Sequence, residues 1–245
     1  MSCEDEHYHG NGHNHNHGHN HGHDHDDHIA PIPTSASQSL NSKVDTSKLT
    51  ALNLANPSQD LGKLFKTSET KYQIKPIIRS DCDCQLIINV PFLNGNVKLY
   101  SIIFRTNGDK YCPKTIKLFK NDKTIDFDNV ETKTPTQKVK HPQVGVLFEE
   151  DEDNIPEVLE EEGDFVEHYL SRSKFTGVHH LTIFIEDIHD DEDDEDECRL
   201  HSIELRGEFT ELNKQPVITL YESAANPADH KNLAVSDYNG MSYGA

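Results

Sequence analysis

The chain has 245 residues, a formal net charge of −20 and only 33% hydrophobic residues. It contains no apolar run of the roughly 18 residues that a membrane-spanning helix needs, and no basic region followed by an apolar one at its N-terminus. The acidic surplus argues against a nucleic-acid surface, because phosphate contacts require clustered Lys and Arg. We therefore expect no membrane anchor, no secretory signal and no nucleic-acid partner.

The N-terminal segment, residues 1–43, has few apolar residues and no periodicity, which predicts a disordered tail. Ten of the 17 histidines lie in it. Imidazole is the commonest protein ligand for Zn, Ni and Cu, so we expect the tail to chelate these metals although the domain requires no cofactor. A low-complexity tail that chelates only incidentally is the alternative. The expected ligands occupy every second position: His13, His15, His17, His19, His21, His23 and His25.

After the tail, Asp45 or Thr46 is placed to cap a short helix that carries Leu49, Leu52 and Leu54 and is stopped by Pro57. From Tyr72 onward the sequence predicts short strands separated by turns at 94–96, 107–109 and 126–129. The clearest strand, 178–185, alternates its side chains between two faces. Many short strands without a long helical period indicate an all-β sandwich or barrel. The expected strands are 72–74, 77–78, 85–90, 97–105, 116–119, near 139, 144–148, 165–170, 178–185, 199–206 and 217–222.

Two acidic runs interrupt the later strands. Residues 149–164 and 186–197 each hold ten Asp or Glu and no Lys or Arg, and the remaining 23 acidic residues equal the 23 basic ones. Blocks of like charge usually stay solvated. We interpret both runs as loops that keep an otherwise neutral domain soluble.

Motifs with chemical potential are few. Cys82 and Cys84 form a single Cys-x-Cys pair, whereas zinc sites normally bring two Cys pairs, so we interpret them as turn cysteines. The five scattered cysteines indicate reduced thiols in the cytosol or nucleus. His179 and His180 start a strand, with one ring expected inside and one outside, in structural roles. Arg206 and Glu208 flank Gly207 and are interpreted as architecture, as an ion-paired bend.

Three ordered blocks resemble the PITH domain family, whose name marks its members as proteasome-interacting. They are Ile87–Phe92 with Gly95–Leu99, Arg172–Ile183, and Leu205–His230, the last read as a strand, a crossing and a second strand. The resemblance implies a jelly-roll-like β-sandwich, similar to galactose-binding-like domains, over residues 44–222. Residues 223–245 would then form a flexible C-terminal tail.

Some proteins of this family carry an N-terminal thioredoxin domain. This chain has no Trp, no Cys-x-x-Cys pair and little sequence before residue 44, so we expect a stand-alone PITH protein and no thiol oxidoreductase.

The resemblance implies a non-enzymatic, monomeric interaction module of cytoplasm and nucleus that binds the proteasome. We expect the C-terminal segment to order on the partner. A small-ligand, carbohydrate-like binding sandwich is the alternative, against which the absence of Trp counts, and metal binding or storage by the tail is another. The predicted partner-binding residues are Asn226, Pro227, Asp229, His230 and Tyr238.

Overall fold

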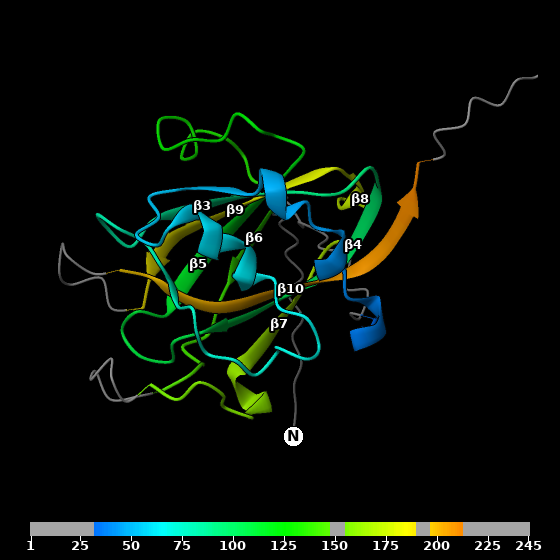
Figure 1. The fold of residues 1–245 in the computed structure, drawn as a ribbon. Coiled ribbons are helices and arrows are strands. Elements are labelled where there is room, and N and C mark those ends of the chain that lie inside the picture. Colours follow the sequence, from blue (N-terminus) through cyan, green and yellow to red (C-terminus); the bar gives the residue numbers. More distant parts are fainter. Residues whose placement is uncertain (1–31, 148–154, 190–196, 213–245) are drawn as a thin grey trace, which may run out of the picture.

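The computed structural model describes residues 32–147, 155–189 and 197–212. These residues form ten strands and several short 3-10 turns (Figure 1). The strands are β1 (Thr50–Leu52), β2 (Ile78–Arg79), β3 (Leu86–Pro91), β4 (Gly95–Thr106), β5 (Pro113–Lys120), β6 (Gln137–Lys140), β7 (Phe165–Tyr169), β8 (Thr176–Val178), β9 (His180–Ile188) and β10 (Arg199–Glu211). The 3-10 turns are η1 (Ala36–Gln38), η2 (Asn41–Lys43), η3 (Thr46–Lys48), η4 (Ser58–Leu64) and η6 (Glu162–Asp164).

The strands make two antiparallel sheets. The first has the order β1-β3-β9-β5-β6, and the second has the order β2-β10-β4-β7 with β8 added on β4. The longest pairing joins β4 and β10, from Leu200 opposite Thr106 to Glu211 opposite Gly95. In Figure 1 the far end of β10 extends beyond the rest of the sandwich.

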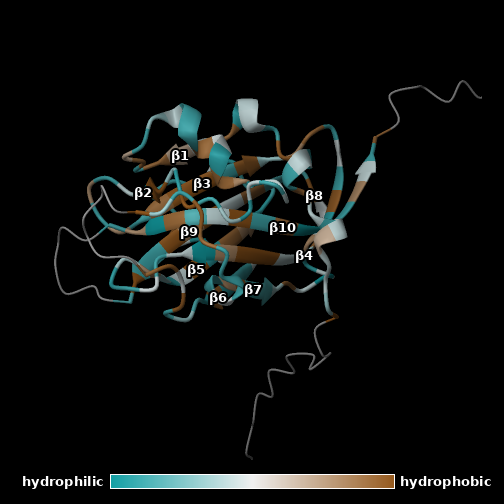
Figure 2. Ribbon diagram, turned by 60° about the horizontal axis from the view of Figure 1, so that its bottom comes forward, coloured by the Kyte–Doolittle hydropathy of each residue, from teal (hydrophilic) through white to brown (hydrophobic). Residues whose placement is uncertain are grey.

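The main hydrophobic core lies between the two sheets, and Figure 2 shows the hydrophobic residues concentrated along the strands. On β9, Leu181, Ile183 and Ile185 point into this core, while Phe184 belongs to a separate cluster on the other face. Alternate residues of a strand face opposite sides of the sheet. The predicted all-β sandwich and the predicted alternation over 178–185 are both confirmed.

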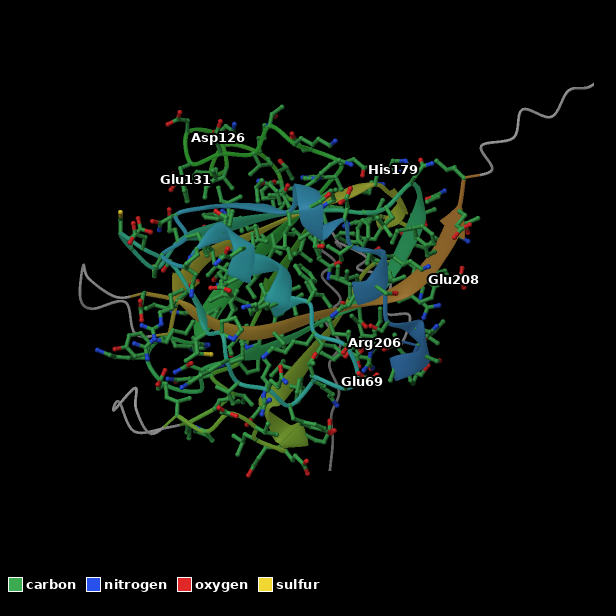
Figure 3. All side chains as sticks on the ribbon, viewed as in Figure 1. Glu69, Asp126, Glu131, His179, Arg206 and Glu208 are labelled. Carbon is green, nitrogen blue, oxygen red and sulfur yellow. The ribbon has the colours of Figure 1, made fainter. Side chains whose placement is uncertain are left out.

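The outer face of the first sheet carries a second, smaller core. Side chains from β3, β5 and β9 pack there against Ile125 and Val130, which come from the long connection between β5 and β6. Asp126 and Glu131 mark this connection in Figure 3. On this outer face the strands also carry polar side chains, such as Thr182 of β9 and Lys117 of β5, so the second core covers only part of it.

Three predicted elements are wrong. The strand expected at 72–74, within the described range 32–147, is absent, since Gln73 forms only an isolated bridge with Val158. The helix expected after Asp45 is replaced by the single turn η3 and by β1, which pairs with β3 through Thr50 opposite Asn89. The tertiary context prevails over local propensity here, because β3 offers backbone hydrogen-bond partners. The expected strand at 144–148 is also absent from the described part of the chain, where Val146 forms only an isolated bridge with Asn107.

The predicted limits of the domain, residues 44–222, stay a prediction, because 213–222 lie outside the described residues. On the N-terminal side, Leu40 and Asn41 are already buried. The backbone N–H of Leu40 also donates to the Leu205 carbonyl over 2.7 Å, which joins this segment to β10.

The Arg206-Gly207-Glu208 block lies within the strand β10, which continues to Glu211, so the crossing predicted over residues 207–211 is wrong. The strand expected at 217–222 lies outside the described residues. A register shift falls between Arg206 and Gly207. A Cβ atom added at Gly207 would lie 2.0 Å from the Lys98 carbonyl oxygen. The predicted ion-paired bend of Arg206 and Glu208 is wrong, because Arg206 pairs with Glu204 at 2.7 Å and Glu208 with Lys98 at 3.7 Å.

We predict that Gly207→Ala lowers the free energy of unfolding by about 2–3 kcal/mol, because the added methyl group forces β4 and β10 apart. Chemical denaturation monitored by far-UV circular dichroism measures it. Gly163→Ala is the matched control, since a Cβ atom at Gly163 meets nothing within 4 Å. Equal stability of the two variants would contradict the close approach of β4 and β10.

Candidate functional site

A pocket of about 920 Å³ opens beside η4 and β2. Its walls come from residues 55–67 and 70–79, with Ile155 closing one side. Figure 1 shows this stretch of chain in cyan, alongside β10. The volume falls within the usual range of ligand pockets, roughly 300–1,000 Å³.

Hydrogen bonds hold the walls of the pocket in place. The side-chain amide of Asn56 hydrogen-bonds to the backbone of β2 and the residue before it, as a neighbouring strand would. Its Nδ2 donates to the Ile77 carbonyl and its Oδ1 accepts from the Arg79 N–H, both over 2.8 Å. A tight turn follows η4, where the Thr67 N–H donates to Thr70 Oγ1 over 3.0 Å. Glu69, labelled in Figure 3, lies on this turn. The pocket is therefore preformed by local contacts.

The lining is basic, although the chain as a whole is strongly acidic. Lys63, Lys66, Lys75 and Arg79 line the pocket together with a single carboxylate, Asp60. Two of these bases have ion-pair partners: Lys63 lies 2.8 Å from Asp60, and Arg79 lies 3.9 Å from Glu197. In the described parts of the chain, Lys66 and Lys75 have no carboxylate partner. The pocket thus carries a surplus of positive charge.

Lys66 is the most unusual of these bases. Burial, together with the positive charge of Arg105, lowers the pKa of its ammonium group to about 8. Its Nζ donates to the carbonyl of Gln73. At pH 7 the group is still mostly protonated, so a partly dehydrated cation faces the pocket without a counterion.

Two buried basic side chains, Arg105 and His201, interact electrostatically with Lys66. Arg105, on β4, is fully buried and donates through Nη2 to Asp164 over 3.1 Å and to the Leu159 carbonyl over 2.7 Å. Its Nε and Nη1 find no hydrogen-bond partner within the described residues. His201, on β10, is also buried, and burial lowers its pKa to about 3, so its ring is neutral. Arg105 thus adds a positive charge behind the pocket that Asp164 offsets.

Asn41 fixes the backbone of this region to β10. Its Nδ2 donates to the carbonyls of Lys66 and Ile203 over 2.9 and 2.8 Å, and its Oδ1 accepts from the Leu205 N–H over 3.0 Å. One buried amide therefore joins the position of Lys66 to the edge of the second sheet.

A second polar cluster lies where the edge strands of the two sheets meet. His141 Nδ1 lies 2.8 Å from His168 Nε2, and His141 Nε2 lies 3.2 Å from Thr106 Oγ1. Burial lowers the pKa of His141 to about 3 and also lowers that of His168. Both rings are neutral at pH 7 and join β7 to the end of β6, which is a structural role.

The site residues predicted from the sequence are not tested by the structure. The tail histidines at positions 13–25 and the partner-binding residues at positions 226–238 lie outside the described residues. Among residues 32–147, 155–189 and 197–212 there is no cluster of three or more His, Cys, Asp or Glu side chains able to hold a metal ion. The same residues contain no helix long and apolar enough to cross a membrane.

The interpretation of the cysteine and histidine pairs as structural agrees with their surroundings. Asp81 and Asp83 raise the pKa of the exposed Cys82 thiol, which is the opposite of the lowered pKa that activates a cysteine. His179 is exposed and His180 is buried, as predicted. His180 Nε2 lies 3.1 Å from Thr182 Oγ1, but its Nδ1 has no partner among the described residues.

Sequence reasoning missed the basic pocket. The signal was present as Lys63, Lys66, Lys71 and Lys75, four lysines within 13 residues of an acidic chain. Only the fold shows that three of these lysines, Lys63, Lys66 and Lys75, line one pocket.

The family of the chain follows from sequence comparison. The family model of the PITH domain matches residues 30–225. PITH domain-containing protein CG6153 of Drosophila melanogaster is 34% identical over 198 residues, which cover 80% of this chain and 82% of the relative. PITH domain-containing protein 1 of Homo sapiens is 33% identical over 190 residues, covering 77% and 79%. The chain belongs to the PITH domain family.

Solved structures give weaker matches. The CBM32-3 domain of a family 31 glycoside hydrolase from Clostridium perfringens aligns with a TM-score of 0.42 and 12% identity, covering 71% of this chain and 97% of that domain. The family 32 carbohydrate-binding module of Streptococcus pneumoniae EndoD aligns with a TM-score of 0.40 and 7% identity, covering 66% and 97%. Likeness at this level carries no argument about a ligand.

We predict that Lys66→Met raises the free energy of unfolding at pH 7 by about 1 kcal/mol, because it removes a partly buried, unpaired charge. The folded pKa of about 8 lies below the ordinary lysine pKa of 10.5, which holds in the unfolded chain. Between pH 8 and pH 10.5 the unfolded chain therefore binds more protons than the folded chain. The free energy of unfolding of the wild-type protein consequently rises with pH over this range. The advantage of the variant should shrink over that range.

Urea unfolding of both proteins at pH 7 and pH 10 measures this effect. The exposed Lys114→Met is the matched control and should leave stability nearly unchanged. A Lys66→Met protein less stable than wild type at pH 7 would show that Lys66 stabilises the fold and would contradict the account of its environment.

Proposed function

We propose that this chain is a non-enzymatic protein-interaction module of cytoplasm and nucleus that associates with proteasomes. Membership of the PITH domain family is the observation that carries the proposal, since the family is named for proteasome interaction. The two-sheet sandwich supplies a rigid platform. The pocket beside η4 supports a binding role, because pockets with a few polar groups at fixed positions suit recognition.

The chemistry of the pocket lining favours binding over catalysis. The lining holds two threonine hydroxyls, Thr67 and Thr70, but no Ser, Cys or His side chain. Nucleophilic catalysis by a hydroxyl requires a neighbouring base. Here Thr67 and Thr70 are hydrogen-bonded to each other over 3.2 Å, and among the described residues neither hydroxyl bonds to a lysine that could act as its base.

A carbohydrate-like ligand fits the pocket less well. Phe65 is the aromatic residue of the lining, and only 6% of its surface is exposed. It therefore offers little ring surface to a sugar. The charged lysines are better suited to an acidic protein segment, so the protein-interaction function is the one the geometry supports.

We predict that the full chain, used as bait in a cell lysate, enriches proteasomes, and that deleting residues 222–245 weakens the enrichment without unfolding the sandwich. Quantitative mass spectrometry of the bound proteins measures it. The deleted segment contains the predicted contacts, Asn226, Pro227, Asp229, His230 and Tyr238.

Leu205→Asp serves as the loss-of-fold control, because it places an unpaired charge at a fully buried position of β10 and should abolish binding by unfolding. Undiminished enrichment after the deletion would exclude a role of the C-terminal segment. Failure of the folded full chain to enrich proteasomes would contradict the proposed partner.

We further propose that the His-rich tail chelates Zn, Ni or Cu. Titration calorimetry with Zn or Ni should show binding that disappears when residues 7–28 are deleted and weakens as the pH falls through about 6.5, where histidine gains a proton. The melting temperature of the domain should hardly change on adding metal, because an ion held by the tail alone does not distinguish the folded from the unfolded domain. A large metal-dependent rise in melting temperature would contradict a site confined to the tail.

A further inference from the structure

The basic pocket presents two lysine ammonium groups over an apolar floor. Lys66 and Lys75 lack carboxylate partners in the described parts of the chain, and Ile77 and Ile155 form part of the lining. Ile77 and Ile155 also belong to a small hydrophobic cluster behind the pocket, so the floor is fixed by packing. A ligand that matches both features carries negative charge next to an apolar group.

The position of the charges favours an anion that enters from outside. Arg105 lies behind Lys66 and is fully buried, with two guanidinium nitrogens unpaired among the described residues. Its positive charge acts on Lys66, and within a low-dielectric region such interactions are stronger than in water. Asp164 already offsets the charge of Arg105. A carboxylate at Lys66 would therefore supply the counterion that Lys66 lacks, whereas a neutral ligand would leave the charge of Lys66 uncompensated.

The chemical class of the ligand follows from the size and composition of the pocket. About 920 Å³ is more than a single free anion fills, and lysines act as point charges that accept a carboxylate in many orientations. The amide nitrogen of Asn56 has a second N–H beside the one that bonds to the Ile77 carbonyl, and this second N–H can donate to a peptide carbonyl. Resting on the proposed function, a protein-interaction module, we propose that this pocket binds an acidic peptide segment of the protein partner. Its carboxylates would contact Lys66 and Lys75, and an apolar side chain would lie against the more exposed apolar residues of the lining, Ala55, Pro57 and Pro76.

A direct test uses a fluorescein-labelled peptide of eight residues that alternates glutamate with leucine, titrated with the full chain at pH 7 and followed by fluorescence anisotropy. We expect saturable binding, although the chain carries a net charge of −20. The double variant Lys66→Gln, Lys75→Gln should weaken it by about tenfold or more, since hydrogen bonds to charged groups are the stronger ones. Lys114→Gln, combined with Lys174→Gln, makes the same change of charge at exposed positions outside the pocket and should leave the affinity within about twofold.

Two further probes identify what the pocket recognises. The same peptide with glutamine in place of glutamate should not bind, and one with serine in place of leucine should bind more weakly. Inorganic phosphate at millimolar concentration should compete only partly. Full competition by phosphate, or equal loss of affinity in the Lys114→Gln, Lys174→Gln protein, would overturn the proposal of a peptide site. So would the absence of saturable binding. Unchanged cooperative unfolding of both double variants shows that any loss is not due to misfolding.

The test of the peptide site and the test of proteasome association can fail independently of each other. If the Lys66→Gln, Lys75→Gln protein still enriches proteasomes as wild type does, the proteasome association stands and this role of the pocket is overturned. If the peptide binds but proteasomes are not enriched, the pocket stands and the partner is a different protein with an acidic segment.

Discussion

The antiparallel pairing of β4 with β10 is the interaction on which the rest of the structure depends. It is the longest pairing in the second sheet, and it contributes residues of both strands to the main core. The close approach at Gly207 allows the two strands to continue together past the register shift. The turns η1, η2 and η4 all contact β10, so the segment that builds the pocket is placed by this strand.

In the basic pocket the fold holds the Lys66 ammonium group in a position where it is partly dehydrated. Arg105 comes from β4 and His201 from β10, and Asn41 holds the backbone of Lys66 against β10. Lys66 is thereby positioned beside a buried guanidinium and loses part of its hydration. Such an arrangement contributes little to stability, because dehydrating a charge is unfavourable unless a counterion is supplied. It is suited to a partner that brings the counterion.

The sequence was sufficient for the class of fold but not for the site. Strands such as Leu86–Pro91 and His180–Ile188 were predictable, because their apolar residues recur with the period of a strand and turn residues bound them. The edge strand Thr50–Leu52 was not, because its leucine spacing also suits a helix and only β3 decides between them. The pocket was invisible for a similar reason: Lys66 becomes distinctive only through Arg105, 39 positions away in sequence, and through Asn41.

Lysine acetylation footprinting of the full chain, with and without purified proteasomes, tests most directly whether the lysines of the pocket face the protein partner, because each lysine is read separately by mass spectrometry. We expect bound proteasomes to protect Lys63, Lys66 and Lys75 from acetylation, while the exposed Lys114 and Lys174 react as in the free protein. Equal reactivity of the three pocket lysines in the free and the bound protein would contradict a pocket that faces the partner.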